Sequence, residues 1–119
     1  MSAPIRAERL TIYVEQTLHR GRVPAFVEIV ERARAAGLAG ATVVQGVEGF
    51  GGSARIHRGH PLSVRADVPI VVTIVDTPEQ IERFVPEVEK LVPRGLIVRQ
   101  PVEVVVHRWG CASGEAAGS

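Results

Sequence analysis

The sequence predicts an α+β sandwich in which a four-stranded antiparallel sheet carries two helices on one face. Three observations support this prediction. Segments with strand-like and helix-like hydrophobic periodicity follow one another in the order β-α-β-β-α-β. A chain of 119 residues has the size of one domain and buries roughly two-thirds of its unfolded surface, enough for a hydrophobic core. Residues 69–76 are apolar at nearly every position, which is typical of a strand covered on both faces.

The composition excludes several classes of protein. Hydrophobic residues make up 45% of the chain and charged residues 23%, with a formal net charge of +1. That balance argues against nucleic-acid binding, which needs a basic face. Cys111 is the only cysteine, so an internal disulfide is excluded and a cytoplasmic location is predicted. Residues 1–7 lack the apolar stretch of a signal peptide, and no run approaches the length of a membrane span.

The first half of the predicted domain contains a strand, a loop, a helix and a second strand. We expect residues 1–7 to form a flexible arm, residues 8–15 an alternating strand and residues 16–23 a loop. Pro24 suits the first turn of a helix, and Gly37 suits its end. Residues with a helical spacing lie between them: Phe26, Ile29, Val30 and Ala33. Residues 41–47 are rich in β-branched side chains and predict the second strand.

The second half begins with the long loop of residues 48–67 and the apolar strand of residues 69–76. A helix start follows, with Thr77 as the N-cap, Pro78 in the first turn and Gln80 completing a capping box. Pro86 lies inside this helix and is expected to bend it. The apolar stripe of the helix consists of Ile81, Phe84, Val85, Val88 and Leu91.

The last predicted strand, residues 96–106, contains Pro101, which indicates an edge strand or a bulge. Residues 110–119 are small and polar and predict a disordered tail, which leaves residues 8–109 as the domain. With right-handed crossovers this order gives a ferredoxin-like βαββαβ sandwich. The sheet face away from the helices is also apolar, and an uncovered apolar face predicts an oligomer.

The loop after the second strand is rich in glycine and is the first candidate binding element. Three glycines around one aromatic residue allow positive φ and a close approach of the backbone to another molecule. Successive N–H groups in such a loop can form a nest for an anion. The alternative is a flexible hairpin loop with Phe50 anchored in the core. The residues concerned are Gly49, Phe50, Gly51, Gly52 and Ser53.

Two segments resemble the PII signalling superfamily. The spacing of Gly37, Gly40 and Thr42-Val43, followed by Gly49-Phe50-Gly51, is similar to its pattern, as is Pro101-Val102-Glu103 in the last strand. The resemblance is closer to the PII-like domain-of-unknown-function family 190 and covers residues 9–106. The motifs that match this family are Arg55-Ile56-His57, Asp67-Val68-Pro69 and the segment from Gly21 to Pro24.

This resemblance implies a PII-like homotrimer with ligand sites in the clefts between subunits. It also implies a regulatory function and, as a partner, a membrane transport protein such as a fluoride channel. Typical PII proteins have Arg-Gln where this chain has Gly52 and Ser53, and they have a longer phosphate-binding loop where it has residues 92–95. These departures argue against a sensor of ATP, magnesium and 2-oxoglutarate. A small anion, or an adenine nucleotide with fewer phosphates, is the expected effector, and no cofactor is required.

Several cationic side chains are candidates for holding that anion. Arg55 and His57 lie in the long loop, and Arg94 precedes the last strand. His107 and Arg108 follow that strand, where PII proteins have two arginines. Guanidinium groups bind phosphate in bidentate fashion, and histidine titrates near neutral pH. The alternative is that these residues belong to solvated loops. No Cys, Asp or Glu lies at metal-ligand spacing from His57, so no metal site is predicted.

The sequence therefore predicts a trimeric regulator, not an enzyme. In this interpretation an anionic effector bound in the intersubunit clefts orders residues 48–64 and changes which partner they contact. Two alternatives stay open at this point, since a fold does not determine a function. One is a metal-binding trimer of the CutA kind or a small enzyme on the same fold. The other is a structural trimer without a ligand.

Overall fold

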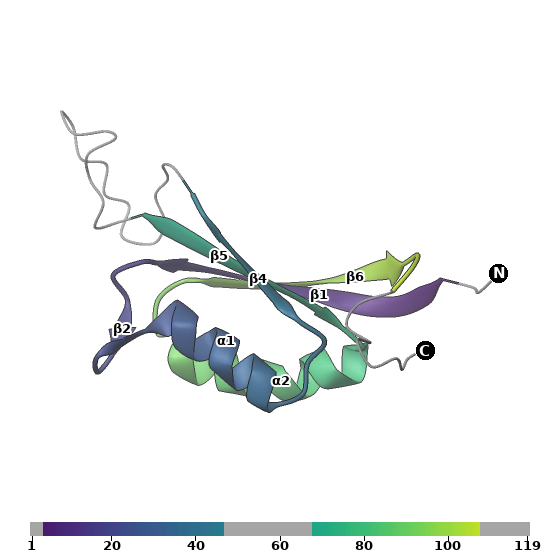
Figure 1. Ribbon diagram of the computed structural model, residues 1–119, viewed down its shortest axis with the longest axis horizontal. Helices are drawn as coiled ribbons and strands as arrows, with labels where there is room; N and C mark the ends of the chain where they lie inside the picture. Colours follow the sequence, from purple (N-terminus) through teal and green to yellow (C-terminus); the bar gives the residue numbers. More distant parts are fainter. Residues whose placement is uncertain (1–3, 47–67, 108–119) are drawn as a thin grey trace.

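The computed structural model describes residues 4–46 and 68–107. In this part of the chain a sheet lies over two helices, which confirms the predicted ferredoxin-like sandwich (Figure 1). The predicted long loop of residues 48–67 and the predicted tail of residues 110–119 lie outside the described residues. The elements are β1 (Ile5–Glu15), β2 (His19–Arg20), β3 (Val23–Pro24), α1 (Ala25–Ala35), β4 (Ala41–Gln45), β5 (Pro69–Asp76), α2 (Pro78–Leu91) and β6 (Leu96–Val104).

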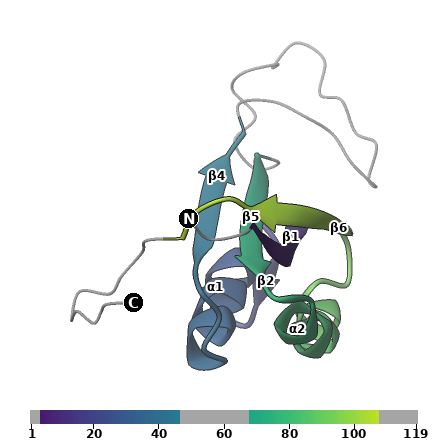
Figure 2. The same ribbon diagram turned by 90° about the vertical axis from the view of Figure 1, so that its right-hand side faces the viewer.

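The main sheet has the strand order β4-β5-β1-β6, and every neighbouring pair is antiparallel. Strands β4 and β6 therefore form its two edges, with both helices on the same side of the sheet (Figure 2). The edge position of β6 confirms the prediction from Pro101. Because the crossovers connect strands that are not neighbours in the sheet, the ends of elements far apart in the sequence meet at the same end of the sandwich.

The core lies between the sheet and the helices. Alternate residues of the two central strands are buried against the helices, which is the period of two expected for a strand. The helices contribute side chains at a spacing of three and four residues. The largest fully buried side chains are Leu10, Ile12, Ile29, Val72, Ile74, Ile81, Val88 and Leu91.

Helix α2 starts at the predicted N-cap, but the predicted capping box is not completed, because the N–H of Thr77 donates to Asp76 and the side-chain oxygen of Gln80 accepts from Arg83. Thr77 is the N-cap, and its hydroxyl accepts a hydrogen bond from the backbone N–H of Gln80, with 3.2 Å between the two atoms. Pro78 occupies the first turn, and Pro86 lies inside the helix. Four of the five predicted stripe residues are buried, while Val85 is partly buried against the same core.

Helix α1 begins differently from the prediction. Pro24 is the N-cap, with φ −60° and ψ 142°, rather than a residue of the first turn. It is extended because it pairs with His19 in a two-stranded hairpin, β2–β3, which replaces the predicted loop of residues 16–23. Gly21 makes the turn of this hairpin at φ +63°. Gly37 has φ +81° just after the helix, which confirms its predicted role at the helix end.

Strand boundaries also differ from the prediction at both ends of the sheet. Strand β1 begins at Ile5 instead of residue 8, so residues 5–7 of the expected arm belong to the sheet. Strand β6 ends at Val104 instead of residue 106, because Val104 pairs with Ile5 and β1 offers no earlier partner. Strand β4 is assigned as Ala41–Gln45 and is shorter than the predicted strand.

Candidate functional site

The two ends of the glycine-rich segment are held together by hydrogen bonds. The N–H of Gly46 donates to the carbonyl of Pro69 at 2.7 Å, and the N–H of Gln16 donates to the carbonyl of Val68 at 2.9 Å. The amide of Gln45 donates to the side-chain oxygen of Gln16 at 3.3 Å. We call these five residues the loop base. Gly46 and Val68, the described residues on either side of residues 47–67, are therefore held at the same end of the sheet.

The backbone at Gly46 approaches Pro69 too closely for a larger residue. A Cβ atom on Gly46 would lie 2.7 Å from Cγ of Pro69, a distance that real Cβ contacts do not show. The proline ring therefore packs directly on the backbone of the neighbouring strand. This contact fixes the direction in which the chain leaves β4.

Arg94 is the predicted site residue that the structure places at this end of the sheet. Its guanidinium nitrogen Nη2 lies 3.7 Å from a carboxylate oxygen of Glu15, and Glu15 is opposite Pro69 in the sheet. The side chain of Arg94 is 72% exposed. An exposed ion pair of this kind contributes little to stability. An anionic ligand at the loop base can therefore compete with Glu15 for the guanidinium group.

The position of Arg94 depends on the glycine that follows it. A Cβ atom on Gly95 would lie 2.5 Å from the backbone oxygen of Tyr13 and 2.8 Å from Cγ1 of Val92. Gly95 is thus the residue that lets the chain turn from α2 into β6 directly against β1. The turn brings the guanidinium group of Arg94 to the carboxylate of Glu15.

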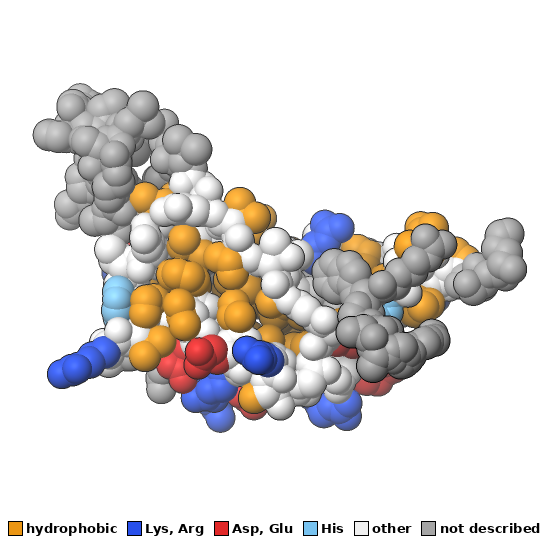
Figure 3. Space-filling view, in the orientation of Figure 1, with side chains coloured by type: hydrophobic (Ala, Val, Ile, Leu, Met, Phe, Trp, Pro, Cys, Tyr) orange, Lys and Arg blue, Asp and Glu red, His pale blue; other side chains and the backbone are white. Residues whose placement is uncertain are grey.

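The β2–β3 hairpin adds a histidine and an arginine that the sequence analysis did not single out. The chain from β1 to the hairpin is tight, since the N–H of Leu18 donates to the carbonyl of Glu15. His19 and Arg22 are exposed, and Nδ1 of His19 lies 2.8 Å from the carbonyl oxygen of Thr17. In Figure 3 a histidine and basic side chains mark this end of the molecule. The signal in the sequence was Gly21 between Arg20 and Arg22, which predicted only a loop.

The other predicted site residues do not join Arg94 within the described part of one chain. His107 follows β6, and the nine residues of β6 separate it from Arg94, about 30 Å at roughly 3.4 Å per residue. These two residues therefore lie at opposite ends of the sheet. The remaining predicted residues lie outside the described residues: Gly49, Phe50, Gly51, Gly52, Ser53, Arg55, His57 and Arg108.

The sheet face away from the helices carries exposed apolar side chains, as predicted, together with the polar pair Arg9 and Gln100, and no described element covers it. We call it the open sheet face. In β1 and β6 it carries Tyr13 and Leu96, which are paired with each other and are 43% and 57% exposed. In β4 and β5 it carries Val44, which is 54% exposed, and its partner Val71. Both pairs lie toward the end of the sheet that carries the loop base.

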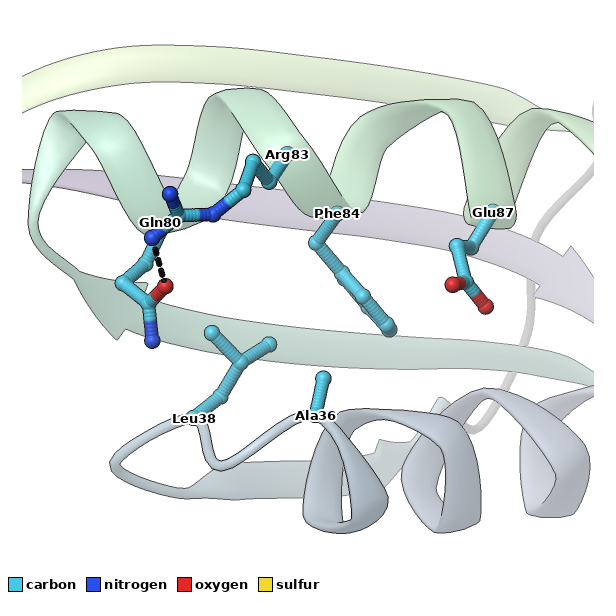
Figure 4. Close-up of a pocket in the computed structure, with 6 residues that line it drawn as sticks. All are labelled: Ala36, Leu38, Gln80, Arg83, Phe84 and Glu87. Carbon is cyan, nitrogen blue, oxygen red and sulfur yellow. Dashed lines mark hydrogen bonds between the residues drawn. The ribbon is translucent and has the colours of Figure 1, made fainter.

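A separate groove lies on the helical side, where the residues after α1 face α2 (Figure 4). Its volume is about 310 Å³. Leu38 and Ala36 point toward Phe84 across it. The charged groups on its wall have partners, since Arg83 donates to Gln80 and Arg32 donates to Glu87 at 3.1 Å. None of the predicted site residues lines this groove, whose lining residues are Ala36, Leu38, Gln80, Arg83, Phe84 and Glu87.

Residues 4–46 and 68–107 form no group of three or more His, Cys, Asp or Glu side chains suited to hold a metal ion. Neither of their helices has the length and apolar character that crossing a membrane requires.

Comparison with known sequences identifies one family. Residues 7–104 match the model of the DUF190 family, described as "Uncharacterized ACR". The chain is also 33% identical over 101 residues to a protein of Aquifex aeolicus (strain VF5) described as "UPF0166 protein". That match spans 85% of this chain and 95% of the relative.

Comparison with solved structures identifies the same fold in a PII-like protein. The chain is similar to CPII of Thiomonas intermedia K12 bound to ADP and bicarbonate, with a TM-score of 0.64 and 17% identity. This match covers 87% of this chain and 93% of that one. A second structure of CPII, bound to ADP, AMP and bicarbonate, has a TM-score of 0.66 and 16% identity, covering 87% and 92%. At these identities the likeness concerns the fold.

Proposed function

Because the chain belongs to the DUF190 family and has the fold of PII-like proteins, we propose that it is a regulatory protein that binds an adenine nucleotide. In this proposal three copies form a homotrimer, the nucleotide binds in the clefts between subunits, and residues 48–64 contact a partner. The single observation that carries the proposal is the position of Arg94. It is an exposed cation at the base of the glycine-rich segment and at the same end of the sheet as the exposed side chains of Tyr13, Leu96 and Val44 on the open sheet face.

The open sheet face supports an assembly of subunits. This face carries exposed apolar side chains such as Val44 and Leu96. A contiguous exposed apolar patch marks an interaction surface. Packing such faces against one another removes apolar area from water, and each Å² buried contributes about 25 cal/mol. A cleft between two such subunits borders the loop base, because the loop base lies at the end of the same sheet.

The charge at the loop base supports an anionic ligand. Arg94, His19 and Arg22 are all exposed at this end of the molecule, and Glu15 is the carboxylate that pairs with Arg94. Phosphate oxygens are strong acceptors for guanidinium groups. Structures of CPII contain ADP with bicarbonate, or ADP and AMP with bicarbonate, so a fold of this kind does hold adenine nucleotides in another protein.

The hydrogen bonds of the loop base suggest how binding reaches a partner. Gln16 contacts both ends of the segment, through Gln45 on one side and Val68 on the other. A ligand that attracts Arg94 away from Glu15 acts one residue from Gln16 in the sequence. In this proposal the change at Glu15 passes to Gln16 and alters how residues 48–64 are presented.

The experiment is a thermal-shift and calorimetric titration of the full chain with ADP, AMP and bicarbonate. A ligand at 100 times its Kd stabilises the native state by about 2.7 kcal/mol, which appears as a clear rise in Tm. We expect ADP or AMP to give this rise and Arg94→Ala to reduce it. Arg83→Ala is the matched control, because Arg83 is an exposed arginine on the helical side whose described partner is the neutral amide of Gln80.

Two results contradict the proposal. One is the absence of stabilisation by any adenine nucleotide, and the other is an Arg94→Ala variant that responds as the wild type does. Sedimentation velocity tests the trimer separately and in the absence of nucleotide. The cytoplasmic location and the membrane transport partner stay predictions from the sequence.

A further inference from the structure

Arg9 places a positive charge on the open sheet face. It belongs to β1, and side chains alternate between the two faces of a strand. Leu10, the next residue, lies in the core between the sheet and the helices, which cover the other face (Figure 1). Arg9 therefore points away from the helices. It is exposed in a single chain, and its guanidinium group donates to the neutral side-chain oxygen of Gln100 at 3.5 Å.

The carboxylates near Arg9 in the sequence and in the register are engaged elsewhere. Glu8 lies on the opposite face, where its carboxylate accepts hydrogen bonds from an arginine of β6. Asp76 is opposite Glu8 in the sheet and accepts from two backbone N–H groups. Glu15 has the same orientation as Arg9, but it lies about 20 Å further along β1 at roughly 3.4 Å per residue, beside Arg94. The described part of the chain therefore leaves the charge of Arg9 without a carboxylate partner.

Thr11 provides a second and independent observation. It lies two positions after Arg9 on the same face of β1, and it is only 7% exposed. Buried hydroxyl groups usually have a hydrogen-bond partner, but no residue of the described chain hydrogen-bonds with the hydroxyl of Thr11. Thr73 of β5 is opposite Thr11, and Thr42 of β4 is opposite Thr73. A row of three threonines therefore crosses the sheet beside Arg9.

Arg9 and Thr11 together supply more hydrogen-bond donors than the face offers acceptors. A guanidinium group has five N–H donors and no acceptor, and a hydroxyl group adds one donor. The residues opposite Arg9 on the two neighbouring strands are Val75 and Gln100, so the side-chain oxygen of Gln100 is the one acceptor in that row. A positive charge with surplus donors and no carboxylate is the chemistry that binds an anion.

The homotrimer of the proposed function brings three copies of these residues together. In that assembly the open sheet faces pack against one another around a three-fold axis, and β1 is a central strand of each sheet. Side chains in the middle of this face therefore point toward the axis. Three guanidinium groups removed from water repel one another and lose their hydration, which is costly unless an anion lies between them.

We infer that Arg9 and Thr11 of the three copies form one site on the three-fold axis for a small oxyanion of the class of sulfate and phosphate. A tetrahedral oxyanion has three-fold symmetry about each of its bonds to oxygen, so its other three oxygens face three equivalent guanidinium groups. The site is incomplete in one chain, which supplies one arginine. This inference rests on the homotrimer of the proposed function and adds a ligand site apart from the loop base.

Equilibrium dialysis of the full chain with radiolabelled sulfate in chloride buffer tests the site. We expect Arg9→Gln to bind one sulfate fewer per trimer than the wild type. The nucleotide sites of the proposed function number one per chain, so the stoichiometry separates the two kinds of site. Thr11→Val removes the hydroxyl and keeps the shape of the side chain. We expect it to raise the Kd for sulfate about tenfold, as the loss of a hydrogen bond to a charged group does.

Arg6→Gln is the matched control. Arg6 is an exposed arginine of the same strand, but it lies on the other face of the sheet, opposite Glu103. We expect this variant to bind as much sulfate as the wild type. Because Arg9 is exposed in one chain, Arg9→Gln leaves the subunit folded. Arg9→Lys keeps the charge without the planar guanidinium group, and we expect it to retain the sulfate with lower affinity.

Sedimentation of the same samples separates failure of the site from failure of the trimer. A trimer that binds no sulfate overturns the inference, and so does one that binds as much sulfate with Arg9→Gln as without it. In both cases the proposed function stands. An Arg9→Gln trimer that loses one sulfate and responds to ADP as the wild type does supports two separate sites. A lone folded subunit at micromolar concentration overturns both proposals.

Discussion

The carboxylate of Asp76 accepts a hydrogen bond from the backbone N–H of Ala39, with 2.8 Å between Oδ2 and the nitrogen. Its other oxygen accepts from the N–H of Thr77 at 2.6 Å. One side chain at the end of β5 thus joins the connection that follows α1 to the start of α2.

Replacing Asp76 with alanine is expected to destabilise the fold. Both N–H groups lose their acceptor, and a lost hydrogen bond to a charged group typically costs about 1.5–3 kcal/mol. We expect the free energy of unfolding in urea to fall by about that amount. Glu79→Ala is the control, because Glu79 is an acidic residue in the first turn of the same helix. Equal unfolding midpoints for the two variants would contradict the assignment.

Gly95 is predicted to tolerate no side chain. In Gly95→Ala the new Cβ meets the backbone of Tyr13, which cannot move without disturbing the sheet, and overpacking typically costs about 1–3 kcal/mol or more. Gly21→Ala is the control. It has φ +63° but open space around the position, so it should cost only the roughly 1–2 kcal/mol of a left-handed residue. Chemical denaturation of both variants measures the difference, and the reverse order would contradict the packing at Gly95.

Much of the fold could be predicted because its signals are local. The cap at Thr77 and the glycine after α1 are determined by their neighbours in the chain, and both were confirmed. The β2–β3 hairpin was missed because only two residues pair on each side, which is too short to produce periodicity. The end of β6 was predicted two residues late, since valines favour a strand whether or not a partner is present.

The candidate site was less accessible to sequence reasoning. The contact of Arg94 with Glu15 joins residues almost eighty positions apart, and nothing in either local sequence indicates it. The separation of Arg94 from His107 was hidden for the same reason, because it depends on the direction of β6 in the sheet. Most of the predicted site residues lie outside the described residues, and their roles stay predictions.

Arg99 is expected to stabilise the junction between the sheet and α2. Its Nε and Nη2 atoms donate to Glu8 at 2.9 and 2.6 Å, and Nη1 donates to Glu82 at 2.7 Å. We expect Arg99→Gln to lower the urea midpoint, by less at 1 M NaCl because salt screens exposed charges. Arg83→Gln is the control, since its described partner is a neutral amide. Two equal midpoints at low salt would contradict this role.

The pH dependence of the Arg99 contribution has a definite sign. The hydrogen bonds that Arg99 donates to Glu82 and Glu8 raise the pKa of Arg99 above its ordinary value. A raised folded-state pKa adds stability that is fully present below the unfolded pKa and is lost only as the pH rises through the folded one. Both values lie well above neutrality. The difference between wild type and Arg99→Gln should therefore stay constant between about pH 6 and 9, and a difference that shrinks toward pH 9 would contradict it.

Mixed trimers distinguish a cleft built by two subunits from a site within one chain. If Arg94 of one copy and His107 of the next hold the nucleotide, then Arg94→Ala and His107→Ala each weaken ADP binding in pure trimers. A trimer that contains both variants has one intact cleft. In that cleft Arg94 comes from a His107→Ala subunit and His107 comes from an Arg94→Ala subunit.

Co-expression with two affinity tags isolates these mixed trimers, and calorimetry counts their sites. We expect one site of wild-type affinity in each mixed trimer and none in either pure variant. A site within one chain gives the opposite result, because every subunit then lacks one of the two groups. Trimers of Arg83→Ala and His107→Ala subunits serve as the control, since the Arg83→Ala change leaves Arg94 and His107 in place. The separation of Arg94 and His107 along β6 makes the first outcome the expected one.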